Sequence, residues 1–268
     1  MASMEDPLTD LPPPSRFDPQ DLFAFSPSST EHLPAPFLVW TPYAHRHLQQ
    51  NGKIASHILL LGLCGIGRHL LHHLPNKTLL GSLILPGVSL ANNHIGLSLQ
   101  DRACYLYFVE GEPSVVLAIV QYEVPAERSF SWVKALFQAI ESERVVVTAG
   151  LQTHHFRGRL SPDDPVLFQL TTDAQRSEDK ENQPIAPYFP SGSLVDGLAA
   201  ALLTHCQLRG IKGRLLILWP DAESSFLPLL ANIFSAIVKE QGGQMLEFRH
   251  GINSFVGKRP IRDTELYL

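Results

Sequence analysis

The sequence has little of what staples a small domain or crosses a membrane. Its three cysteines, Cys64, Cys104 and Cys206, lie far apart and form no C-x-x-C pair, which argues against a disulfide framework or a zinc ribbon. The longest apolar run, around ILLLGLCGIG, is well short of the roughly 20 residues that span a bilayer. The stretch MASMEDPLTDLPPPSRFDP lacks the basic and apolar regions of a secretory signal. We therefore expect a reduced, cytoplasmic protein without a membrane partner.

An excess of positive charge is also missing. The chain has 21 Lys and Arg residues against 26 Asp and Glu residues, a net charge of -5, which gives no reason to expect nucleic acid. Apolar residues make up 44% of the 268 residues and charged residues 18%, as in globular proteins. A chain of this length buries a core without a metal or disulfide. The expected partner is a protein or a small molecule.

Short apolar runs suggest strands from about Phe37 onward. Several lack polar alternation, as strands covered on both faces do. The runs are FLVWT, SHILLLG, ACYLYFV, SVVLAIVQY, RVVVTAG and GRLLILW. Only EGEP separates the third run from the fourth, so part of the sheet is expected to be antiparallel.

Helical spacing predicts three longer helices between these runs. Pro125 opens the first, whose apolar stripe includes Phe130 and Ile140. Ser193 is the expected cap of the second, with Cys206 on its apolar stripe as a core thiol. The third begins near Phe226 and ends at two glycines. Strands with covering helices predict a single α/β domain, a three-layer α/β/α sandwich with a mixed sheet.

Composition divides the chain into three parts. Residues 1–36 form a Pro-rich leader that we expect to be disordered, residues 37–255 the α/β domain, and residues 256–268 a C-terminal tail. Within the domain, a polar stretch at about 157–190 includes TTDAQRSEDKENQPIAP. Its charge predicts a solvent-exposed insertion that is at least partly disordered.

The segment LLLGLCGIGRHLL resembles a dinucleotide-binding turn only superficially. Gly62, Gly65 and Gly67 are spaced G-x-x-G-x-G rather than G-x-G-x-x-G, and each glycine of that fingerprint has its own place in the turn. No acid follows about 20 residues later to bind a ribose hydroxyl. We interpret the glycines as a tight strand-to-helix turn and expect no cofactor.

The histidines form no convincing metal or catalytic motif. His69, His72 and His73 recur one helical turn apart, but the Glu of H-E-x-x-H and a further ligand are missing. His154 and His155 follow a strand, where an α/β active-site loop could lie, but G-x-S-x-G is absent. We therefore predict no metal ligand and no catalytic residue, although an acid pair assembled only in space stays open.

The chain ends in DTELYL, an apolar and aromatic tip with a free carboxylate. Leu266 and Tyr267 supply apolar area, the phenol can form a hydrogen bond, and the Leu268 carboxylate can pair with a lysine. A hydrophobic residue, then Tyr, then any last residue is the pattern of tails that dock between α subunits of the 20S proteasome. The alternative is a tail that packs on its own domain.

From about Phe37 to its end the chain resembles the proteasome assembly chaperone 1 family. The similarity is strongest in YLYFVEGEPSVVLAIVQYEVPAERSFSWVKALFQAI, VVVTAGLQTHHFRG and SLVDGLAAALLTHCQLRGIKGRLLILW. The terminal LYL falls where that family carries its docking tail.

This resemblance implies a non-catalytic chaperone that forms a heterodimer with proteasome assembly chaperone 2. In that family the pair binds the outer face of the α ring and promotes assembly of the ring and of the 20S core particle. The partners it implies are therefore proteasome assembly chaperone 2, proteasome α subunits and 20S assembly intermediates. Carried over by position, the proteasome-binding residues are Leu266, Tyr267 and Leu268. The alternatives are a small-molecule enzyme with an α/β/α sandwich fold and an interaction module whose tail is structural.

Overall fold

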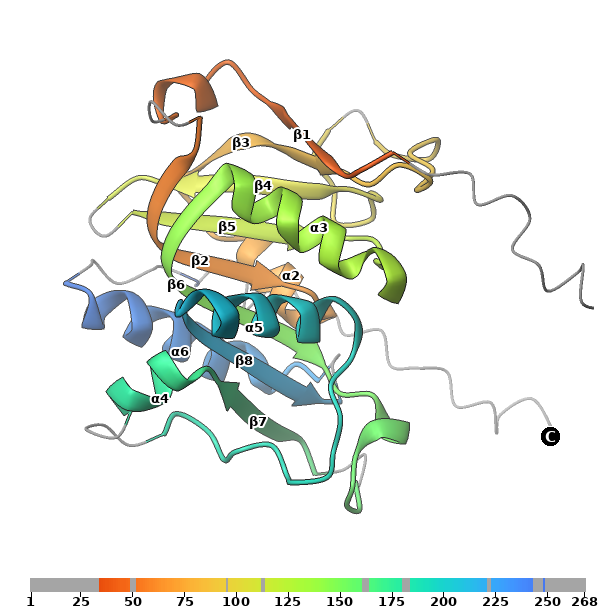
Figure 1. Ribbon diagram of the computed structural model, residues 1–268, viewed down its shortest axis with the longest axis vertical. Helices are drawn as coiled ribbons and strands as arrows, with labels where there is room; N and C mark the ends of the chain where they lie inside the picture. The colour runs from red at the N-terminus through yellow and green to blue at the C-terminus, as the bar shows by residue number, and fades with distance from the viewer. Residues whose placement is uncertain are drawn as a thin grey trace, which may run out of the picture. The chain divides into compact units, whose positions relative to one another are not determined.

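The computed structural model describes residues 34–48, 52–94, 96–111, 114–160, 164–179, 184–220, 223–242 and 248. The chain divides into two units at Pro34, and the helices and strands below belong to the second. Eight strands form one sheet in the order β1-β3-β4-β5-β2-β6-β8-β7 (Figure 1). The strands are β1 (Phe37–Trp40), β2 (Ile54–Gly62), β3 (Lys77–Ile84), β4 (Cys104–Val109), β5 (Val115–Val120), β6 (Ile140–Gly150), β7 (Val166–Thr171) and β8 (Lys212–Trp219).

The sheet is mixed, as the sequence predicts. Strand β2 runs parallel to β5 and to β6, and β6 runs parallel to β8. The remaining pairs, β1–β3, β3–β4, β4–β5 and β7–β8, are antiparallel. The runs on either side of EGEP pair from Cys104 opposite Val120 to Val109 opposite Val115. Strand β5 is buried along its whole length, which explains its unbroken apolar run.

Helices cover both faces of the sheet and complete the three layers. The helices are α2 (Gly65–His72), α3 (Ala126–Ala139), α4 (Asp173–Asp179), α5 (Gly197–Arg209) and α6 (Phe226–Glu240), with 3₁₀ turns η1 (Ala44–Arg46) and η2 (Thr153–His155). Helices α3 and α5 pack on one face, where Trp132 and Leu202 are buried. Helices α2 and α6 pack on the other, where Leu70 and Phe234 are buried. This confirms the predicted single-domain α/β sandwich. No helix among the described residues is long and apolar enough to cross a bilayer.

Two predicted helices differ in detail from those observed. Phe130 is 58% exposed. Trp132 is fully buried in α3 instead, and its Nε1, which burial removes from water, donates a hydrogen bond to the Tyr122 hydroxyl at 2.9 Å. Ser193 does not cap α5, which begins four residues later. The Ser193 hydroxyl instead accepts a hydrogen bond from the Arg157 backbone N–H at 2.9 Å. Ile140 begins β6 rather than ending α3.

The polar stretch at about 157–190 contributes to the fold. The sequence predicts an exposed and partly disordered insertion there. The structure places β7 and α4 in it, so the stretch is not an exposed loop throughout. Residues 161–163 and 180–183 lie outside the described residues, and the expected partial disorder stays a prediction. Strand β7 pairs along its length with β8, and α4 is tied to the sheet by buried charges. Arg214 Nη2 lies 2.7 Å from Asp179 Oδ1, and Arg144 Nη2 lies 2.7 Å from Glu178 Oε2.

The predicted leader and C-terminal tail stay predictions. Residues 1–33 and 249–268 lie outside the described part of the chain, so neither the disorder expected for the leader nor the boundary between domain and tail is tested.

Candidate functional site

The predicted docking residues, Leu266, Tyr267 and Leu268, lie outside the described residues. Their docking role therefore stays a prediction. The described residues do place every other motif that the sequence singles out, together with two surface pockets that only the fold reveals.

The glycine turn between β2 and α2 is filled by protein atoms. A Cβ on Gly67 would lie 1.9 Å from Thr148 Oγ1, and a Cβ on Gly62 would lie 2.9 Å from the Arg68 backbone nitrogen. The Cys64 sulfur caps α2 by accepting a hydrogen bond from the Gly67 N–H at 3.4 Å. The glycines therefore let α2 approach β2 and β6 closely, in agreement with a tight turn rather than a phosphate cradle.

The ring of His73, the residue that follows α2, contacts those of His69 and His72, tilted to the first and edge-on to the second. The rings of His69 and His73 lie 4.0 Å apart, and those of His72 and His73 lie 5.2 Å apart. Burial, with Lys77 and the other two histidines, lowers the pKa of His72 to about 4. Within the described part of the chain, no group of three or more His, Cys, Asp or Glu side chains is placed to hold a metal ion.

The cysteines are buried. Cys206 lies in the core between α5 and the sheet, as predicted. Burial raises the pKa of the Cys206 thiol to about 12 and raises that of the Cys104 thiol as well. Both thiols are therefore protonated at neutral pH and are poor nucleophiles.

A groove of about 560 Å³ lies at the carboxyl ends of β5, β2 and β6, where open α/β sheets bind ligands. Most of its lining is apolar side chain or backbone; Glu123 and Asp196 are the charged residues in it. Its lining includes the Cys64 thiol but no imidazole or amine that could activate it. His155 lies outside this lining, with its Nδ1 3.6 Å from Asp196 Oδ2. The enzyme alternative gains no support from this groove.

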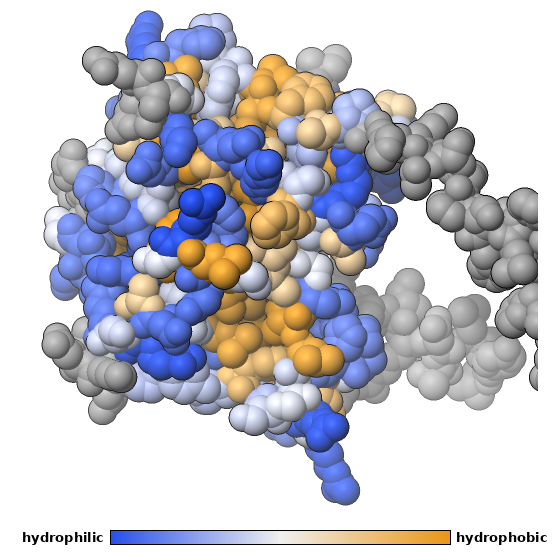
Figure 2. Space-filling view, viewed as in Figure 1, coloured by the Kyte–Doolittle hydropathy of each residue, from blue (hydrophilic) through white to orange (hydrophobic). Residues whose placement is uncertain are grey.

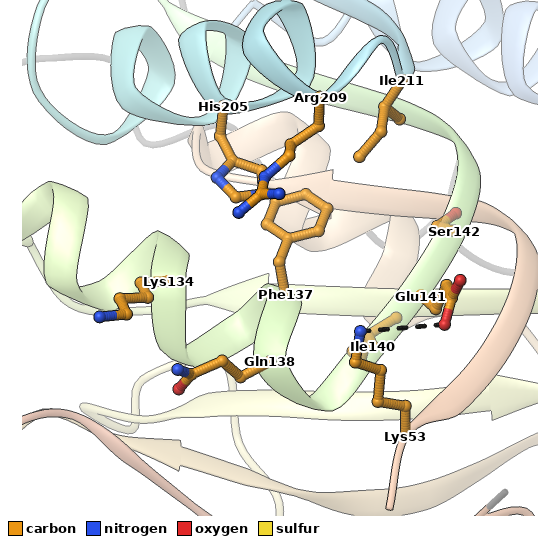
Figure 3. Close-up of a pocket in the computed structure, with 10 residues that line it drawn as sticks. All are labelled: Lys53, Lys134, Phe137, Gln138, Ile140, Glu141, Ser142, His205, Arg209 and Ile211. Atoms are coloured by element: carbon orange, nitrogen blue, oxygen red, sulfur yellow. Dashed lines mark ion pairs between the residues drawn. The ribbon is translucent and has the colours of Figure 1, made fainter. Parts of the chain in front are cut away.

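A second pocket, of about 460 Å³, lies between the C-terminal ends of α3 and α5 and the start of β6 (Figure 3). We call it the basic pocket. It is lined by Lys53, Lys134, Phe137, Gln138, Ile140, Glu141, Ser142, His205, Arg209 and Ile211. Sequence reasoning missed it because its residues come from three separate segments. The only local signal is the spacing of His205 and Arg209, four residues apart on one face of α5.

The sequence has relatives among proteasome assembly chaperones. No family model matches it. It is 31% identical over 115 residues to proteasome assembly chaperone 1 of Xenopus laevis, a match that covers 41% of this chain and 38% of that protein. It is 24% identical over 142 residues to proteasome assembly chaperone 1 of Dictyostelium discoideum, covering 50% of this chain and 51% of that protein. The matches thus span about half or less of these curated relatives.

Solved structures show the same fold. Pyrococcus furiosus PbaB, an archaeal proteasome activator, matches with a TM-score of 0.55 and 16% identity over 82% of this chain and 93% of that chain. Pyrococcus furiosus PbaA, an archaeal homolog of proteasome-assembly chaperone, matches with a TM-score of 0.52 and 19% identity over 82% and 87%. The sequence matches confirm the resemblance to proteasome assembly chaperone 1.

Proposed function

We propose that this chain, a relative of proteasome assembly chaperone 1 in sequence and similar in fold to an archaeal homolog, is a proteasome assembly chaperone. The observation that carries the proposal is the 31% identity to a curated protein of that name. The two curated relatives are named as assembly chaperones rather than as enzymes.

In this proposal the chain forms a heterodimer with proteasome assembly chaperone 2 in the cytoplasm. The pair binds the outer face of the α ring and promotes ring and 20S core particle assembly. The tail formed by Leu266, Tyr267 and Leu268 inserts between α subunits. Support for these finer points comes from the family resemblance and from the hydrophobic-Tyr-X ending of the chain.

The tail is too short to bind tightly alone. Burying one Leu and one Tyr contributes about 1.5–3 kcal/mol each. Ordering a loose tail costs about 1–2 kcal/mol per residue of backbone. The gain and the cost nearly cancel over three residues, so affinity must come from a broader surface or from a second tail on the partner, through effective concentration.

The test is binding of the heterodimer to 20S core particles. The full chain would be co-expressed with proteasome assembly chaperone 2, and the purified pair compared with a pair whose tail ends at Glu265. A matched control is Thr264→Ala, which changes the tail outside the docking motif.

We expect the intact pair and the Thr264→Ala pair to bind and the truncated pair to bind more weakly, with no change in melting temperature. No binding by a correctly folded intact pair would refute the proposed function. Equal binding by intact and truncated pairs would refute the role of the tail alone. A large fall in melting temperature on truncation would instead show that the tail packs on its own domain.

A further inference from the structure

We propose that the basic pocket binds an acidic segment of a protein partner, with an apolar side chain of that segment on the pocket floor and its carboxylates at the rim. This inference goes beyond the docking tail and depends on the proposed function only for the choice of a protein as partner. The apolar floor and the positive charge at the rim both favour such a segment.

The floor of the pocket is a flat apolar surface. The rings of Phe137 on α3 and His205 on α5 stack with their centroids 4.3 Å apart and their planes 19° apart. The half-buried Ile211 extends this surface along the pocket, whereas Ile140, which also lines the pocket, is fully buried. Burial and the neighbouring Arg209 lower the pKa of His205, so the imidazole is neutral at neutral pH and adds a stacking surface rather than a charge. An aromatic or branched aliphatic side chain fits such a floor.

The rim carries an excess of positive charge. Three lysine and arginine residues line the pocket with one glutamate, a net charge of +2 in a chain whose net charge is -5. Lys53 forms an ion pair with this glutamate, with its Nζ 3.9 Å from Glu141 Oε2. Neither Lys134 nor Arg209 has a carboxylate partner among the described residues. Acidic side chains of a partner would supply the missing counter-charges.

The arrangement favours a peptide segment over a compact anion such as phosphate. Phosphate sites use the N-terminal ends of helices, where backbone N–H groups and the helix dipole both attract an anion. Here α3 and α5 point their C-terminal ends at the pocket, so the helix dipoles attract neither phosphate nor carboxylate, and the attraction for an anion comes from the lysine and arginine side chains. Figure 3 shows Arg209 beside the stacked rings, with Lys134 at one side of the pocket and Lys53 at another. Cations spread in this way match several carboxylates along a chain better than one small ion.

The pocket also opens on an accessible part of the surface. Figure 2, viewed toward α3 and α5, shows hydrophilic residues gathered over the side of the domain where these two helices end. Lys134 is exposed, and Leu208, next to Arg209 in α5, is 73% exposed. A partner segment can therefore reach the floor without a change in the fold.

The experiment selects peptides directly. A display library of random peptides would be panned against the full chain and, in parallel, against Lys134→Glu, the double variant Lys134→Glu/Arg209→Glu and the control Lys239→Glu. Lys239 is exposed on α6, on the opposite face of the sheet. Lys134→Glu alone changes an exposed residue in the middle of α3, so it keeps the test valid if the double variant fails to fold.

We expect enriched peptides that combine Asp or Glu with an aromatic or branched side chain. A synthetic copy of one of them should lose about threefold to tenfold in affinity with Lys134→Glu and at least tenfold with the double variant, and should be unchanged with Lys239→Glu. Enrichment of peptides without acidic residues, or equal affinity for all variants, would overturn the proposal. Displacement of the peptide by inorganic pyrophosphate at matched ionic strength would also overturn it, in favour of a small-anion site.

This test is separate from that of the proposed function. Peptide selection uses the isolated full chain, whereas tail docking is measured on core particles with the heterodimer. If truncation weakens core-particle binding but no acidic peptide is selected, the proposed function stands and the pocket proposal is refuted. Selection of acidic peptides, together with no binding of the correctly folded intact pair to core particles, would leave the pocket as a binding site in a protein with another function.

Discussion

Replacing Gly67 by alanine tests directly whether the glycine turn serves packing. In an isolated helix, alanine is more favourable than glycine by about 1 kcal/mol, so helix propensity alone predicts that Gly67→Ala stabilises α2. The structure predicts the opposite sign. A Cβ at this position would lie 1.9 Å from Thr148 Oγ1 and 2.9 Å from Thr148 Cβ.

The size of the effect follows from the surroundings of Thr148. This side chain is fully buried in β6, and its hydroxyl donates a hydrogen bond to the Leu61 carbonyl at 3.2 Å, so it cannot turn away into solvent. Overpacking of this kind costs about 1–3 kcal/mol. After subtracting the gain of about 1 kcal/mol from helix propensity, we expect a net loss of up to about 2 kcal/mol in the free energy of unfolding, or up to roughly 8 °C in melting temperature.

Urea unfolding of four chains would measure it: the original chain, Gly67→Ala, Thr148→Gly and the double variant. Thr148→Gly removes both clashing atoms, so the double-mutant cycle should give a coupling free energy of at least about 1 kcal/mol in favour of the pair. Thr148→Val is the matched control, because it keeps the branched shape and should give no relief. Stabilisation of the chain by Gly67→Ala, or the absence of this coupling, would show that Thr148 does not exclude a side chain at position 67.

Two further predictions concern charges. Asp179→Ala should lower the free energy of unfolding by about 3–5 kcal/mol, because it leaves the guanidinium of Arg214 buried without its carboxylate. Urea unfolding measures this loss, with Asp164→Ala as a control at an exposed residue. An equal loss from both variants would contradict the prediction. For His72, a folded pKa of about 4 against an ordinary 6.5 means that the unfolded chain takes up the proton first, so stability is lost as the pH falls from about 6.5 towards 4. Because His72 is only partly buried, we expect the free energy of unfolding to fall by about 1–3 kcal/mol over this pH range. His72→Asn should flatten the curve of melting temperature against pH in this range. Parallel curves for the two chains would count against a lowered pKa of His72.

Local patterns predicted the parts of the fold in which one type of side chain repeats. Strand β5 and helix α6 are such parts, because every residue of β5 is buried and α6 carries a broad apolar stripe. Strand β3 was missed because Gly81 interrupts its apolar run. That glycine is needed because a Cβ there would lie 2.3 Å from the Val39 carbonyl oxygen on the neighbouring strand. Such a requirement arises only after β1 and β3 have paired.

Strand β7 and the basic pocket were missed for a related reason. Gln169, in the middle of β7, is fully buried, and its Oε1 accepts a hydrogen bond from Arg214 Nη1 at 2.7 Å. Polar residues normally indicate solvent, and the partner that makes burial possible is 45 residues away. The basic pocket likewise unites Lys134 of α3 with Arg209 of α5. No local pattern links two such positions.

The position of β2 in the centre of the sheet has a consequence during synthesis. Its hydrogen-bonding partners on either side are β5, which begins at Val115, and β6, which begins at Ile140. When Gly62 is made, about 50 residues must still be added before β5 begins, which takes roughly 3–10 s at ordinary rates of translation. During that interval a strongly apolar segment is without both neighbours. The nascent chain is therefore most vulnerable to aggregation before its hairpin β4–β5 emerges from the ribosome, and changes that slow translation of residues 63–115 should lower the yield of folded protein more than equal delays near the C-terminus.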